Sequence, residues 1–162
     1  MPISGEQYRN IGRAAAGAVS VVAADARDAS AVVALTVSSF VTLSFEPPLV
    51  MFAIQHNADS YSTLVASKAF GVSLLASSQC ELAQRFARKG RDKTLDFGFE
   101  RGGRLAVPLV PQALAQIECS TNQIVMSGDH AIVIGLVEGA RTREGEPLLY
   151  FARHYGTFQP LP

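Results

Sequence analysis

Tryptophan is absent from the chain, and cysteine is nearly so, with only Cys80 and Cys119 among 162 residues. Two cysteines are too few for a disulfide framework, and their spacing does not match a metal knuckle. No run of about 18 uncharged apolar residues is present to span a bilayer. The N-terminal MPISGEQYRN also lacks the charged-then-apolar pattern of a signal peptide. We therefore expect a soluble cytoplasmic protein that does not enter membranes.

An excess of charge of either sign is missing as well, because 14 basic residues balance 14 acidic ones. Without a basic field, neither a nucleic acid nor an anionic membrane surface is an expected partner. Apolar residues make up 48% of the chain. A chain of this length can bury a substantial core without disulfides or metals, so we expect one domain spanning residues 1–162.

Several functional motifs are also lacking. No G-x-G-x-x-G follows a strand and no G-x-x-x-x-G-K-[ST] occurs, so any nucleotide must be held without these phosphate-binding loops. No G-x-S-x-G is present, which gives serine hydrolysis little support. His56, His130 and His154 are far apart, with no cysteine nearby, so we expect no metal site.

The most informative stretch is residues 34–48, ALTVSSFVTLSFEPP. From Thr36 its even positions are mostly hydroxyl-bearing and its odd positions mostly apolar. Because side chains on a strand alternate faces, the stretch is predicted to be one strand with a polar and an apolar face, which the prolines terminate. The hydroxyl-bearing face has two interpretations. It can be the solvent-exposed face of an ordinary strand, or it can supply uncharged hydrogen-bond donors that bind a flat polar ring.

The remaining pattern predicts a mainly β protein, a barrel with a few helices. A helix runs from the S-x-x-Q pattern at Ser4 to Gly17, a short one covers residues 62–66, and an S-x-x-E box at Ser78 begins a third that ends at Gly90. Residues 25–30 read as a turn and 90–113 as a long loop. Further strands are expected at residues 18–24, 49–54 and 69–75, and two more begin at residues 31 and 115. The strand at 49–54 is expected to be covered on both faces. A hairpin is expected at residues 127–130, and a closing strand near Tyr155. Strand–helix alternation is absent, which argues against a doubly wound parallel sheet.

Several polar positions have both a functional and a structural interpretation. Residues 55–64, QHNADSYSTL, precede a helix and could bind an anion or simply cap that helix. His130 follows Gly128 and Asp129 at the mouth of the predicted barrel, where a solvent-exposed turn histidine is equally compatible. Cys80 fits a first-turn helix position. The basic cluster around the end of the third helix can complement the helix dipole or neutralise a phosphate; its members are Arg85, Arg88, Lys89, Arg91 and Lys93.

Five segments in order resemble the flavin reductase-like family, the split-barrel flavin-binding proteins that serve as reductase components of two-component monooxygenases. AVSVVAA resembles the family's G-V-x-V-V opening, and ALTVSSFVTLSFEPPLVMFAI resembles G-x-T-x-[NS]-S-F-x-S-[VL]-S-x-[DE]-P-P-L-V. The run from STLVASKAF to LAQRFA, then GDHAIVIGLV and PLLYFARHYGTF, are similar to its later motifs. Ser38 stands where asparagine is common, and Leu35 where a small or methionine-type residue often stands.

The resemblance implies a split β-barrel, Greek-key-like and of the FMN-binding type, assembled as a homodimer with flavin near the subunit interface. It also implies a set of site residues. Thr36, Val37, Ser38 and Ser39 would line the isoalloxazine and ribityl chain; Gln55, Ser60 and Ser62 would meet the ribityl and phosphate region, helped by Phe86 and Lys93; His130 would sit near the nicotinamide, and Tyr155 would close the pocket.

The expected function is that of an NAD(P)H:flavin oxidoreductase that passes hydride from NADH or NADPH to FMN or FAD and supplies reduced flavin to a separate oxygenase. Hydride transfer is intrinsic to the two cofactors, so the protein supplies placement and polarity, with His130 as its one candidate catalytic residue. Two alternatives remain open: a non-catalytic flavin-binding or electron-relay protein of the same fold, and a barrel that binds some other ligand.

Overall fold

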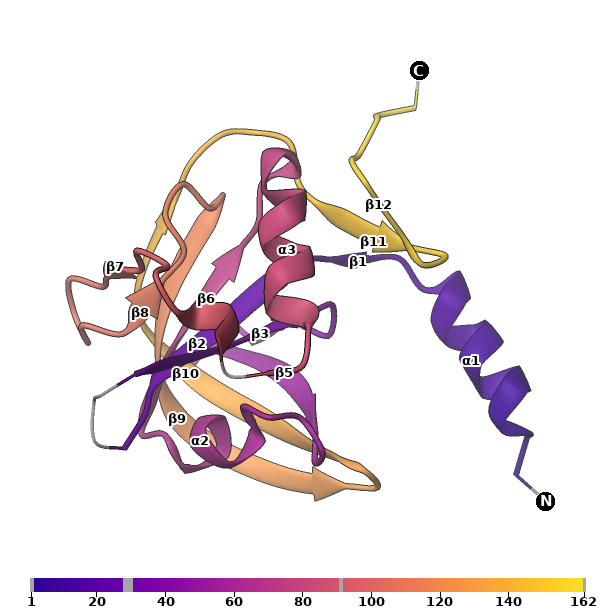
Figure 1. Ribbon diagram of the computed structural model, residues 1–162, viewed down its shortest axis with the longest axis horizontal. Helices are drawn as coiled ribbons and strands as arrows, with labels where there is room; N and C mark the ends of the chain where they lie inside the picture. Colours follow the sequence, from indigo (N-terminus) through magenta and orange to yellow (C-terminus); the bar gives the residue numbers. More distant parts are fainter. Residues whose placement is uncertain (1, 28–30, 91, 162) are drawn as a thin grey trace.

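A seven-stranded antiparallel sheet forms the body of the protein (Figure 1). The computed structural model describes residues 2–27, 31–90 and 92–161. The strands lie in the order β3-β2-β6-β9-β10-β5-β4. Their bounds are β2 Ser20–Asp25, β3 Val32–Val37, β4 Val41–Ser44, β5 Leu49–Gln55, β6 Ala69–Leu74, β9 Ala115–Ser127 and β10 His130–Thr142. The expectation of a mainly β fold with a few helices is confirmed.

Smaller elements surround this sheet. A second sheet joins β1 (Gly17–Ala18), β11 (Leu149–Phe151) and β12 (His154–Gly156), and a two-stranded ribbon joins β7 (Glu100–Arg101) to β8 (Pro108–Leu109). The helices are α1 (Gly5–Ala14), α2 (Tyr61–Ala66) and α3 (Cys80–Ala87), with 3₁₀ turns η1 (Ser77–Gln79) and η2 (Asp92–Thr94). In Figure 1, α3 crosses the face of the sheet, whereas α1 and the C-terminal segment stand away from the body.

The stretch predicted as one strand is in fact two, which corrects the sequence interpretation. β3 and β4 lie at opposite edges of the sheet, and residues 38–40 cross between them. Val41 pairs with Met51 and Thr42 with Val50, so extending this register by two positions sets Ser39 opposite Ala53. There the Ser39 side chain replaces a backbone partner: its Oγ accepts from Ala53 N at 3.0 Å and donates to Ala53 O at 3.2 Å. The crossing keeps the two-residue alternation, which is why the sequence alone concealed the break.

The apolar face predicted for this stretch is buried by the chain at Val37 but not beyond it. Val41, Leu43 and Phe45 expose 45%, 44% and 95% of their surface. β4 is an edge strand that pairs with β5 alone. Three apolar side chains on an unpaired edge are unusual, because exposed apolar edges promote association.

Two apolar clusters stabilise the fold. One lies inside the curved sheet, where the rings of Phe52 and Phe70 meet edge to face at 5.4 Å. Gly135 makes room for Phe70, since a Cβ there would lie 2.5 Å from its ring. The other fills the space between the sheet and α3 and includes Phe86, whose ring meets that of Phe97 edge to face with the centroids 5.2 Å apart. Burying large aromatic side chains gives each cluster several kcal/mol of favourable transfer free energy, about 2 kcal/mol per ring.

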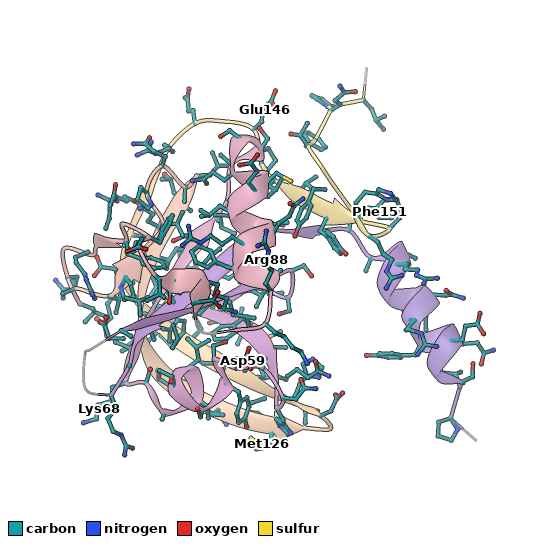
Figure 2. All side chains as sticks on the ribbon, viewed as in Figure 1. Asp59, Lys68, Arg88, Met126, Glu146 and Phe151 are labelled. Atoms are coloured by element: carbon teal, nitrogen blue, oxygen red, sulfur yellow. The ribbon has the colours of Figure 1, made fainter. Side chains whose placement is uncertain are left out.

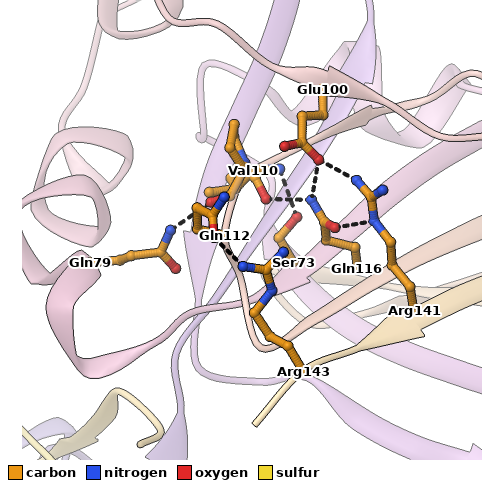
Figure 3. A network of polar contacts seen from close by, with 9 residues as sticks. Ser73, Gln79, Glu100, Val110, Gln112, Gln116, Arg141 and Arg143 are labelled. Carbon is orange, nitrogen blue, oxygen red and sulfur yellow. Dashed lines mark hydrogen bonds and ion pairs between the residues drawn. The ribbon is translucent and has the colours of Figure 1, made fainter. Parts of the chain in front are cut away.

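The segment 90–113, expected to be irregular, is held by side chains of β9 and β10 rather than by a long ladder (Figure 3). Gln116 Nε2 donates to Val110 O at 2.6 Å and to Glu100 Oε2 at 3.1 Å, and Arg141 contacts both Gln116 and Glu100. Ser73 Oγ accepts from Val110 N at 2.9 Å. The buried side chains of Ser73 and Gln116 are therefore satisfied, and their hydrogen bonds fix the loop.

Other local predictions have mixed outcomes. The capping box of Ser4 with Gln7 and the hairpin at 127–130 are confirmed. The box at Ser78 is wrong: α3 begins at Cys80, and Gln79 Oε1 accepts from Ala76 N at 3.0 Å instead. Residues 49–54 alternate between buried and half-buried rather than being covered equally on both faces. Of the predicted turn at 25–30, residues 28–30 lie outside the described residues. No helix in the described part of the chain is both long and apolar enough to cross a bilayer.

Candidate functional site

A cavity of about 380 Å³ lies where β3, β5, α3 and the β9–β10 hairpin meet. We call it the β3–β5 cavity. Its lining comprises residues 35–39, 53–55, 57–59, 87–89, Lys93 and His130. Its volume is within the range of small-molecule sites, which is about 300–1,000 Å³. The wall formed by residues 36–39 is neutral and bears hydroxyl groups, and the end formed by Arg88, Lys89 and Lys93 is basic.

The hydroxyl-bearing wall is held in place by its own side chains. Thr36 Oγ1 donates to Ala83 O of α3 at 2.8 Å, which ties the helix to β3. Ser39 Oγ binds both backbone groups of Ala53. Ser38 is exposed at the cavity. Two of the three hydroxyls therefore shape the wall, and Ser38 is the one positioned to meet a ligand.

His130 stands at the opposite side of the cavity, at the first position of β10. Its backbone pairs in register with Gln55 of β5, so both side chains reach the same rim. The Nδ1 atom lies 2.7 Å from Asp129 Oδ1, and the hydrogen bond from His130 is the main reason that the pKa of Asp129 is lowered. Of the His130 side chain, 43% is exposed. Asp129 thus orients the imidazole and leaves its Nε2 available at the mouth of the cavity.

The basic end is built on a buried lysine. Lys93 is only 9% exposed, and its Nζ donates to Phe86 O at 3.1 Å and to Arg88 O at 3.0 Å, at the C-terminal end of α3. Burial lowers the pKa of Lys93, and the carboxylate of Asp59 opposes this effect. Asp59 in turn accepts from Gly90 N at 2.6 Å. Figure 2 shows Asp59 and Arg88 near the lower end of α3.

Seven of the eleven residues predicted from the sequence line this cavity: Thr36, Val37, Ser38, Ser39, Gln55, Lys93 and His130. Four do not. Ser60 is 2% exposed and lines a neighbouring cavity of about 200 Å³ that shares Asp59 and Lys93. Ser62 lines a third cavity, beside Lys68. Phe86, a residue of α3, is buried between that helix and the sheet. Tyr155 packs against Tyr150 with ring centroids 5.1 Å apart.

Residues that the sequence did not single out for this site also line it. Asn57, Asp59, Arg88 and Lys89 contribute polar groups to the cavity, and Asp129 orients His130. Their sequence signals were present, in the polar segment 55–64 and in the basic cluster, but only the fold brings them together. Arg91 of that cluster lies outside the described residues. In the described ranges, no three His, Cys, Asp or Glu side chains come close enough to hold a metal ion.

Residues 12–159 match the family profile described as the flavin reductase like domain. The chain belongs to the flavin reductase-like family. It is 39% identical over 122 residues to the reductase component of 4-hydroxyphenylacetate 3-monooxygenase from Thermus thermophilus, covering 75% of this chain and 76% of that protein. It is 32% identical to the FMN reductase (NADH) SmoA of Agrobacterium fabrum, covering 93% and 84%.

The fold is that of the flavin reductase split barrels. The crystal structure of BorF, the flavin reductase component of a bacterial two-component tryptophan halogenase, superposes with a TM-score of 0.87 at 29% identity. The match covers 98% of this chain and 100% of that one. The β3–β5 cavity is accordingly the candidate flavin site of this flavin reductase-like protein.

Proposed function

We propose that this protein is an NAD(P)H-dependent flavin reductase, a single-domain enzyme that uses NADH or NADPH to reduce FMN or FAD and supplies the reduced flavin to a separate oxygenase. The observation that carries the proposal is the β3–β5 cavity, because a neutral wall and a buried cation occupy its two ends. Membership of the flavin reductase-like family supports it.

The residues present fit a flavin nucleotide. A flat ring with polar edges suits the neutral wall at Thr36–Ser39, and a phosphate suits the end where Lys93 and Arg88 lie. Ser60 Oγ, beside that end, is buried and has no hydrogen-bond partner among residues 2–27, 31–90 and 92–161. A buried hydroxyl without a partner is costly, and a ligand oxygen would satisfy it.

When bound, the flavin supplies the electron-accepting ring that takes up hydride. The chain's own residues place and polarise the reactants. Ser38 and the backbone of 36–39 would hold the polar edge of the ring, because hydrogen-bond donors there favour negative charge. His130, oriented by Asp129, would bind the carboxamide of the nicotinamide at the open side of the cavity.

We further propose that the working enzyme is a homodimer in the cytoplasm, where NADH is available. No residue of α1 is buried, and Tyr8 and Ile11 expose 70% and 60% of their surface. The apolar edge formed by Val41, Leu43 and Phe45 is exposed as well. A second copy is the simplest cover for these surfaces, and light scattering of the purified protein tests this by its mass.

The test of the function is NADH and NADPH oxidation measured with and without added FMN or FAD. We expect a rate that depends on added flavin. A protein that binds flavin, and is yellow, but does not oxidise NADH or NADPH would instead be a flavin carrier or electron relay. A protein that does neither would contradict the proposal altogether.

A further inference from the structure

A small hollow of about 190 Å³ lies between the C-terminal half of α1 and the β11–β12 hairpin. We call it the α1 notch. The turn of the hairpin meets the end of the helix, where Ala152 N donates to Arg13 O at 3.2 Å (Figure 1). The notch shares no lining residue with the β3–β5 cavity. Its lining comprises Arg9, Gly12 and Arg13 of α1 with Tyr150, Ala152 and Arg153 of the hairpin.

The notch gathers positive charge without a counter-charge. Arg9, Arg13 and Arg153 are all exposed, and no carboxylate in residues 2–27, 31–90 or 92–161 forms an ion pair with them. Arg13 donates to Asn10 Oδ1 at 3.0 Å and lies in the last turn of α1, where a cation complements the helix dipole. Neither reason applies to Arg9 or Arg153. Because like charges repel when they are brought together, a bound anion would offset the repulsion.

The turn that carries Arg153 has an unfavourable backbone conformation. Ala152 and Arg153 have φ angles of +49° and +70°. Phe151 pairs with His154 across them, so they are the two central residues of the hairpin turn. Such turns favour glycine, asparagine or aspartate, because other side chains crowd the backbone at positive φ. An arginine therefore occupies a position that glycine would fill with less strain, which indicates that its side chain has a function.

The size of the notch and its donors define the ligand. A volume of about 190 Å³ is below the range of about 300–1,000 Å³ typical of sites for larger ligands, so the notch accommodates one small group. Guanidinium groups bind phosphate and carboxylate oxygens through paired N–H donors, and they stay charged at physiological pH. Three of them around one small space favour an anion with more than one negative charge.

We propose that the α1 notch binds a small free oxyanion of two or more negative charges, such as inorganic phosphate, and that this anion fastens α1 to the hairpin. No residue of α1 is buried, and the hydrogen bond from Ala152 N to Arg13 O joins the backbones of helix and hairpin. An anion held by arginines of both elements adds a second link. Because it binds when the two elements are together, it stabilises the position of the helix by mass action. Flavin reduction is not required for this binding.

The test measures phosphate binding by titration calorimetry at constant ionic strength, with chloride as the reference anion. Arg153→Gly removes one guanidinium group and suits the positive φ, so the fold should be retained and the Tm should not fall. Arg9→Gln removes a second guanidinium group from the opposite wall. Arg88→Gln is the matched control, because Arg88 lies at the basic end of the β3–β5 cavity, which is the competing phosphate site.

We expect Arg88→Gln to bind phosphate within about twofold of the wild type, and Arg153→Gly and Arg9→Gln each to raise the Kd by about tenfold. Amide hydrogen exchange in α1 should slow with phosphate in the wild type but not in Arg153→Gly. Weaker binding in Arg88→Gln alone would place the anion in the β3–β5 cavity and overturn the proposal, as would no binding beyond the chloride reference. Exchange in α1 that ignores phosphate would refute the fastening. Binding of a glutamate-rich peptide without binding of phosphate would assign the notch to a protein carboxylate and overturn the free oxyanion.

Discussion

Ser39→Ala and Ser38→Ala should separate the stability of the cavity wall from its ligand contacts. Ser39 Oγ makes two hydrogen bonds to the backbone of Ala53, at 3.0 and 3.2 Å, where β4 has no residue to pair. Losing two such bonds at about 1 kcal/mol each lowers the free energy of unfolding by about 2 kcal/mol. For a chain of this size, that corresponds to a fall in Tm of about 4–8 °C.

Ser38 is the adjacent control. It is exposed at the cavity, so its replacement should change the free energy of unfolding by less than about 0.5 kcal/mol and yet weaken flavin binding. Calorimetry and fluorescence titration of flavin on both variants measure the two effects. Equal thermal stability of Ser39→Ala and wild type would refute the claim that a side chain replaces the missing strand partner. Unchanged flavin binding in Ser38→Ala would refute the proposed position of the ring.

Four further predictions concern the site and the core. Thr36→Val should cost about 1 kcal/mol of stability by removing the hydrogen bond to Ala83 O, whereas Thr36→Ser should not; urea denaturation measures both, and equal losses would count against that bond. His130→Ala should raise the KM for NADH about tenfold with the Kd of flavin nearly unchanged, and His154→Ala should change neither; loss of flavin binding would show that His130 serves the flavin instead. Burial lowers the pKa of Lys93 from its ordinary value of 10.5, so Lys93 should lose its charge, and FMN binding should weaken, at a pH below 10.5. Riboflavin lacks the phosphate, so its binding should not weaken over the same pH range. Parallel loss of binding by both would contradict a contact between Lys93 and the phosphate. Burial, assisted by Glu118 and Glu138, raises the pKa of Cys119 to about 12, so a thiol reagent should modify Cys80 alone in the native protein; rapid labelling of both would contradict the burial.

The sequence predicted the strands and hairpins well where one face is buried and a turn residue marks the end. The β9–β10 hairpin is an example, because the polar SGDH interrupts two apolar runs. It failed at residues 38–40, since the chain crosses from one sheet edge to the other without losing its alternation. It also failed at Ser78, where the Gln79 side chain caps a 3₁₀ turn that displaces the start of α3.

Half of the site could be predicted in the same way. The hydroxyl-bearing residues Thr36, Ser38 and Ser39 lie within four positions, so a single motif reveals them. Asp59 is far in sequence from the basic cluster of Arg88 and Lys93, and only the packing of α3 against β3 brings the carboxylate and the cations to one end of the cavity. The burial of Lys93 and the missing partner of Ser60 Oγ depend on that packing and have no signature in the sequence.

The most direct test of the central claim is to add NADH without oxygen to the protein loaded with FMN and follow the visible absorbance of the flavin. We expect rapid bleaching in the wild type, and bleaching that requires a much higher concentration of NADH in His130→Ala. Flavin that is bound yet stays oxidised in the wild type, at saturating NADH and NADPH alike, would contradict it.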